Sequence, residues 1–115
     1  MVMTYNFTIE QGCDFARGFY FRDCGGSVDL TGYTAAMQIR QSKRAREAVD
    51  TLTTENGRLI LDKKKAKIDV VIPHDVTANY PATKLVYDLV IKSSEGYVYR
   101  VLQGAISVDG GVTRV

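Results

Sequence analysis

The sequence predicts an all-β fold: an antiparallel β-sandwich or small barrel of about eight strands, with at most one short helical turn near residues 75–80. Three observations lead to this prediction. Apolar and polar residues alternate in several short runs, which is the pattern of half-buried strands. Glycine, asparagine and aspartate cluster between the runs, where they favour turns. Only one short segment carries the signals of a helix.

Length and composition favour a single globular domain over residues 1–115, with flexible ends at residues 1–4 and 110–115. Chains usually divide into domains only above about 150 residues. The 45% apolar and 24% charged residues are typical of globular proteins. We find no apolar stretch of about 18 residues and no signal-peptide pattern, so we expect synthesis in a cytosol and no membrane contact.

The first half of the chain contains three expected strands. Residues 5–10 alternate apolar and polar side chains, and residues 15–22 resume the alternation after a break. We expect these two segments to pair as a hairpin. Residues 23–26 contain adjacent glycines, which supply the positive φ angles of a tight turn. A third alternating strand covers residues 34–40.

Three connecting segments follow. Residues 41–49 form the most polar stretch of the chain, so we expect an exposed loop or a short frayed helix. The dipeptide Asn56-Gly57 lies between apolar runs and is the strongest short hairpin signal in the sequence. A lysine-rich turn at residues 62–66 leads into another alternating strand over residues 67–72.

One helical turn is expected after this strand. Pro73 ends the strand by removing a backbone donor, and Asp75 is expected to cap a turn over residues 76–79.

The last part of the chain predicts a hairpin. Residues 84–92 and 97–102 are rich in β-branched and aromatic residues and flank a four-residue turn. Gly104 is expected to form a bulge or bend before a final strand over residues 105–108. The expected core is led by Phe7, Ile9, Phe19, Phe21, Leu30, Ile39, Leu59, Ile68, Val70, Leu89, Ile91 and Val101.

Several short segments follow one another through the chain: residues 11–15, 19–33 with Asp29-Leu30-Thr31-Gly32-Tyr33, 37–40, 52–57 and 87–89, and then Gly96 and residues 100–104. Their order and spacing resemble those of small virion structural proteins of tailed phages, in particular β-sandwich modules that attach fibres or receptor-binding proteins to a baseplate. The resemblance covers nearly the whole chain and depends on the order of its motifs, because each motif alone is common. It implies an assembly subunit of the tail, neck or baseplate, made in the host cytoplasm and present in the virion as a symmetric homo-oligomer.

Residues that could support catalysis or bind a metal are few. Cys13 and Cys24 have no zinc-motif spacing and are too few for a disulfide scaffold, so we expect free thiols. His74 is the only histidine, and no nucleophile signature surrounds it, although a site assembled in space from Cys13 and His74 stays open. The carboxylates are scattered. We therefore expect no enzyme activity, no cofactor and no metal site.

Contacts with other subunits are expected at the exposed loop and at the C-terminal end. These segments carry charged or apolar side chains that the domain's own core does not require. The lysines at residues 63–67 are expected to keep strand ends soluble and to block edge pairing, so we do not expect nucleic acid as a partner. The candidate contact residues are Lys43, Arg44, Arg46, Glu47, Val112, Arg114 and Val115.

A second functional hypothesis is glycan binding. Tyr97 and Tyr99 share one face of an expected strand, and an exposed tyrosine pair can stack against a sugar. Exposure of this pair beside a groove would favour a carbohydrate-binding module, whereas burial between the sheets or against a neighbouring subunit would favour the assembly subunit.

Overall fold

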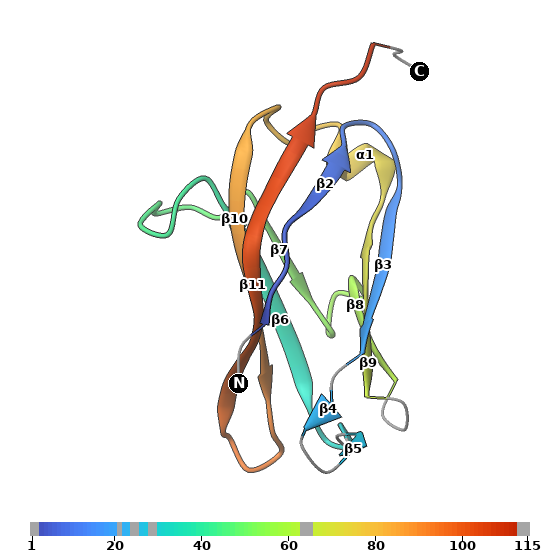
Figure 1. The fold of residues 1–115 in the computed structure, drawn as a ribbon, viewed down its shortest axis with the longest axis vertical. Helices are drawn as coiled ribbons and strands as arrows, with labels where there is room; N and C mark the ends of the chain where they lie inside the picture. The colour runs from blue at the N-terminus through green and yellow to red at the C-terminus, as the bar shows by residue number, and fades with distance from the viewer. Residues whose placement is uncertain (1–2, 21, 24–25, 28–29, 63–65, 113–115) are drawn as a thin grey trace.

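The computed structural model describes residues 3–20, 22–23, 26–27, 30–62 and 66–112. Strands dominate it, and two sheets pack against each other around one apolar core (Figure 1). The predicted all-β sandwich is therefore confirmed.

The larger sheet has the strand order β1-β11-β10-β6-β7, and β2 also pairs with β11. At its centre β10 runs antiparallel to β11, with which it forms a hairpin, and to β6, which is distant in the chain. The strands of this sheet are β1 (Met3–Thr4), β2 (Phe7–Glu10), β6 (Thr34–Arg40), β7 (Asp50–Thr53), β10 (Lys84–Lys92) and β11 (Val98–Asp109).

The smaller sheet has the order β3-β9-β8, and a separate two-stranded ribbon joins β4 to β5. The lysine-rich segment does connect a hairpin, because Asp62 of β8 pairs with Lys67 of β9. The strands are β3 (Phe15–Tyr20), β4 (Arg22–Asp23), β5 (Gly26–Ser27), β8 (Leu59–Asp62) and β9 (Lys67–Ile72).

The core follows from the alternation in each strand. In β10 every second side chain, beginning with Leu85, is buried against the smaller sheet, and the intervening side chains face outward. Of the expected core, Phe19 and Val101 are only partly buried, and Phe21 lies outside the described residues. The remaining expected core residues are all buried: Phe7, Ile9, Leu30, Ile39, Leu59, Ile68, Val70, Leu89 and Ile91.

The expected hairpin between the first two strands is wrong. β2 pairs with β11 in parallel, with Phe7 opposite Ile106, whereas β3 pairs with β9 in the other sheet. The chain crosses between the sheets at residues 11–14, so the buried faces of β2 and β3 meet across the core. The rings of Phe7 and Phe15 stack there with centroids 5.1 Å apart. β1 and β2 pair with β11 in parallel, whereas the other strand pairs of the two sheets are antiparallel as expected.

The turn at Asn56-Gly57 exists, but it does not close a hairpin. Gly57 has a φ of 79°, as a tight turn requires, and the Asn56 side-chain oxygen accepts hydrogen bonds from the amides of Thr53 and Arg58. The strands on either side belong to different sheets, because β7 pairs with β6 and β8 pairs with β9. The turn therefore carries the chain from the larger sheet to the smaller sheet, and each flanking strand buries one face in the core between them.

Gly104 does not form the expected bulge, since β11 continues through it. The irregularity lies at Val101, because Leu89 pairs with Leu102 while the next residue of β10 pairs with Arg100. Gly104 instead permits a close approach: a Cβ atom there would lie 2.1 Å from the carbonyl oxygen of Tyr5.

The single described helix, α1, spans His74–Thr77. Pro73 occupies the N-cap position, and Asp75 lies in the first turn without capping it, which corrects the expected cap. A carboxylate from another strand end satisfies the free amide: Asp14 Oδ1 accepts a hydrogen bond of 2.6 Å from the backbone N–H of His74.

Two further expectations concern the loop and the chain ends. Residues 41–49 contain no helix and form an exposed loop, and the hairpin of β10 and β11 is present. Residues 3–4, which we expected within a flexible end, pair with β11 as β1.

Candidate binding surfaces

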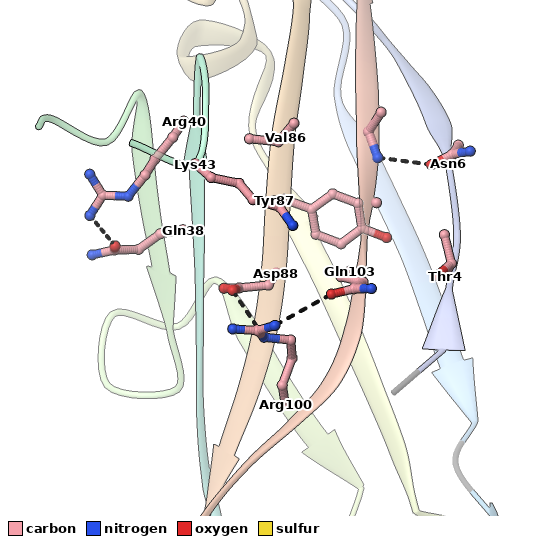
Figure 2. A pocket seen from close by; sticks show the side chains of 12 residues that line it. Thr4, Asn6, Gln38, Arg40, Lys43, Val86, Tyr87, Asp88, Arg100 and Gln103 are labelled. Carbon is pink, nitrogen blue, oxygen red and sulfur yellow. Dashed lines mark hydrogen bonds and ion pairs between the residues drawn. The ribbon is translucent and has the colours of Figure 1, made fainter. Parts of the chain in front are cut away.

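A groove of about 500 Å³ lies on the outer face of the larger sheet (Figure 2). It crosses β6, β10, β11 and the segment that contains β1, and the loop over residues 41–49 reaches it at one end. The lining residues are Thr4, Asn6, Gln38, Arg40, Lys43, Val86, Tyr87, Asp88, Arg100, Gln103, Gly104 and Ala105.

Strand register brings the groove residues together. Asp88 of β10 lies opposite Gln38 on one side and Gln103 on the other. Directly paired residues present their side chains on the same face of a sheet. Most of the groove is therefore lined by the outward-facing side chains of these strands, whereas the inward-facing side chains of the same strands fill the core.

One end of the groove contains a compensated charge pair. Arg100 Nε lies 3.3 Å from Asp88 Oδ2, and Arg100 Nη1 lies 3.5 Å from Gln103 Oε1 (Figure 2). Both side chains of the ion pair are about half exposed, so the pair orients the guanidinium more than it stabilises the fold.

The other end contains two cations without a carboxylate partner. Arg40 donates to the carbonyl oxygens of Ala45 and Arg46 at 2.8 and 3.2 Å, and to Gln38 Oε1 at 2.6 Å. These acceptors are neutral, so the Arg40 charge is left uncompensated. Lys43 extends from the loop across the outer face beside Val86 (Figure 2). Within the described residues, neither Arg40 nor Lys43 forms an ion pair.

The predicted contact residues fall into separate places. Lys43, Arg44, Arg46 and Glu47 are exposed on the loop, and of these only Lys43 lines the groove. Val112 is 97% exposed beyond β11. The loop and the C-terminal end project from different sides of the sandwich (Figure 1). Arg114 and Val115 lie outside the described residues.

The tip of the β10–β11 hairpin exposes consecutive large apolar side chains. Tyr97 and Val98 are each 61% exposed, and Tyr99 is 50% exposed. Tyr99 pairs with Ile91, which faces the core side of the sheet, whereas Val98 pairs with Lys92 on the opposite face. The tip is therefore apolar on both of its faces.

Sequence reasoning did not find the groove. Its polar members, such as Gln38, Asp88 and Gln103, read individually as solvated strand positions. Their alternation did indicate an outward face. Bringing them into one site requires the pairing order β6-β10-β11, which joins segments that are distant in the chain.

The suggested combination of Cys13 and His74 does not assemble as a nucleophile and base. His74 Nδ1 lies 2.9 Å from Asp14 Oδ1, and Cys13 takes part through its carbonyl oxygen, which accepts a hydrogen bond from the Thr77 hydroxyl. The hydrogen bonds from His74 lower the pKa of Asp14. These contacts join the β2–β3 connection to α1.

A second polar cluster links the two sheets. Asp50 Oδ2 accepts hydrogen bonds from Arg58 Nη2 and from the Tyr80 hydroxyl, and Arg58 Nε donates to the carbonyl oxygen of Val71. Burial, together with the hydrogen bond to Asp50, raises the pKa of Tyr80. The cluster is largely buried, and no buried side-chain nitrogen or oxygen among the described residues lacks a hydrogen-bond partner, which is typical of a structural network.

Across the described ranges, no group of three or more histidine, cysteine, aspartate or glutamate side chains could hold a metal ion. No described helix is long and apolar enough to cross a membrane. No protein-family model matches the sequence, and no curated protein matches it.

Proposed function

We propose that this chain is a structural subunit of a tailed-phage virion, in the tail, neck or baseplate, and that it acts through contacts with neighbouring subunits rather than through catalysis. The observation that carries the proposal is the apolar hairpin tip, Tyr97 to Tyr99, which projects from a rigid sandwich. The order of sequence segments described above supplies the virion context.

The geometry of the tip favours a protein partner. Large exposed apolar patches mark interaction sites, and tyrosine is enriched in protein interfaces. Because Tyr99 and Val98 face opposite sides of the hairpin, a partner that buries both must surround the tip. A protein pocket can do this, whereas a sugar ring stacks on one face only.

The exposed loop and the end of the chain offer further contacts. Arg44, Arg46 and Glu47 extend from the loop, and Val112 extends beyond β11. Symmetric repetition in a virion ring would add many such contacts, each weak by itself. A cytosolic subunit that joins a particle in this way needs no cofactor.

Particle composition tests this proposal. Quantitative mass spectrometry of purified particles from the organism that encodes the chain should find it at a fixed copy number per particle. The Tyr97→Ser/Tyr99→Ser variant should fold normally but enter particles at less than about one tenth of the parent level, because interface anchors dominate binding. Absence of the parent chain from particles would contradict the proposal.

A second candidate function is glycan recognition, because Tyr97 and Tyr99 are both exposed. It predicts that the isolated domain binds a cell-surface glycan and that the same double variant loses this binding. A Val98→Ser variant separates the two candidates: it should weaken a partner that surrounds the tip and leave stacking on the tyrosine face unchanged.

A further inference from the structure

The outer groove has an uneven charge distribution. Three of its lining residues are cationic (Arg40, Lys43 and Arg100) and one is anionic (Asp88). The ion pair with Asp88 compensates Arg100, so the excess positive charge belongs to Arg40, on β6, and to Lys43, whose side chain reaches from the loop across β10 (Figure 2). A ligand carboxylate placed there would gain charge-assisted hydrogen bonds that no described group of the domain now supplies.

The rest of the groove offers neutral donors and a small apolar floor. Asn6 Oδ1 accepts a hydrogen bond of 2.9 Å from the backbone N–H of Ala105, which directs the amide nitrogen of Asn6 away from β11 (Figure 2). Val86, Gly104 and Ala105 contribute the floor. The groove can therefore bind one anionic group at the loop end and hydrogen-bonding groups beyond it.

The length of the groove matches a short extended peptide. It crosses from β6 through β10 and β11 to β1, which is three strand spacings or about 14 Å. About four residues of extended chain span this distance. The aromatic residue in the lining, Tyr87, is buried with its ring on the core side, so the groove offers no exposed ring for sugar stacking.

We propose that this groove binds an extended acidic polypeptide segment, with glutamate or aspartate side chains against Lys43 and Arg40 and the neighbouring residues across β10 and β11. The inference rests on the proposed function, because it assigns the segment to a neighbouring virion protein. It concerns a different surface from the hairpin tip, and the two surfaces can be tested separately.

The test is direct binding to the full chain. The probe is a fluorescent six-residue peptide that alternates glutamate and threonine, compared by fluorescence polarisation with the same peptide carrying glutamine for glutamate. We expect the acidic peptide to bind at least about tenfold more tightly, and its affinity to fall as salt increases, because the contact is partly exposed and electrostatic.

Adjacent loop residues provide a matched control. Lys43→Glu reverses a charge inside the groove, and Arg44→Glu reverses an equal charge on the next residue, outside the lining. Lys43→Glu should weaken acidic-peptide binding by about tenfold or more, and Arg44→Glu by less than about threefold. Circular dichroism of both variants should match the parent, since both side chains are exposed.

Three results would overturn the inference. The first is equal loss in the two variants, which would indicate diffuse attraction to the whole loop. The second is equal binding of the glutamine peptide. The third is binding of an oligouronate, an acidic sugar chain, without binding of the acidic peptide. If the peptide binds as expected while particles lack the chain, the groove assignment stands and the proposed virion function fails.

Discussion

The hydroxyl of Tyr87 donates a hydrogen bond of 2.6 Å to the carbonyl oxygen of Tyr5, across a sequence separation of 82 residues. Gly104 makes this contact possible. It lies opposite Tyr87 in the sheet, and its missing side chain lets the Tyr5 carbonyl approach β11. The first strands of the chain are thereby fixed to the centre of the larger sheet, beside the groove.

Gly104→Ala should lower the free energy of unfolding by about 1–3 kcal/mol, because the new methyl group collides with backbone rather than with a flexible side chain. Urea denaturation measures the change. Tyr87→Phe should cost about 1 kcal/mol by removing the hydrogen bond alone. The exposed Tyr97→Phe is the matched control and should be neutral. Equal effects of the two tyrosine variants would contradict this role of the Tyr87 hydroxyl.

Stability should fall at alkaline pH because of Tyr80 and Tyr87. Burial raises the pKa of both phenols above the usual value of about 10. A group whose pKa is raised in the folded state stabilises the fold fully below its unfolded pKa, and that contribution is lost as the pH rises through the folded pKa. The melting temperature should therefore decline above about pH 10.

The Tyr80→Phe/Tyr87→Phe variant should show a flatter decline over this alkaline range, even though it is less stable at neutral pH. Scanning calorimetry from pH 8 to pH 11 compares the two proteins. Parallel curves would show that these two phenols do not carry the alkaline effect.

The Asp50 cluster should behave as a coupled unit. Arg58→Met removes the cationic partner of a partly buried carboxylate, and we expect a loss of about 1–3 kcal/mol. Tyr80→Phe should cost less by itself. A double-mutant cycle between these variants should give a coupling of at least about 0.5 kcal/mol, because both groups bind the same Asp50 oxygen. Strict additivity would argue against a shared network.

Asp14 should stabilise α1 in a way that depends on pH. Hydrogen bonds from His74 lower the pKa of Asp14, so its contribution is present above the unfolded pKa of about 4 and is lost as the pH falls through the lower folded pKa. Asp14→Asn should melt below the parent between pH 5 and pH 7. The difference should shrink as the pH falls below the unfolded pKa of about 4. A difference that stays constant down to pH 2 would show that charge at Asp14 is irrelevant.

The sequence predicted local structure better than pairing. The sequence predicts the β10–β11 hairpin and the turn at Asn56-Gly57 correctly. Both predictions depend on signals between residues close together in the chain: the alternation of apolar and polar side chains, and the preference of Asn-Gly for tight turns. The same Asn-Gly signal predicts that the two flanking strands pair with each other in one sheet, whereas β7 and β8 belong to different sheets. An alternating pattern predicts that one face of a strand is buried in the core. It does not identify the strand that pairs with it.

The same limit explains the candidate site. Exposure of Lys43 could be predicted from the polarity of its loop, whereas the sequence left both exposure and burial of Tyr97 open. The convergence of Arg40, Asp88 and Arg100 could not be predicted, because it depends on the register of three strands and on a one-residue irregularity at Val101.

A reconstruction of the particle by electron cryo-microscopy tests the central claim most directly. We expect copies of this sandwich arranged symmetrically in the tail, neck or baseplate, with Tyr97 and Val98 of each copy enclosed by a neighbouring protein. Particles whose density contains no such sandwich, or contains it with the hairpin tip free in solvent, would contradict the proposed virion role.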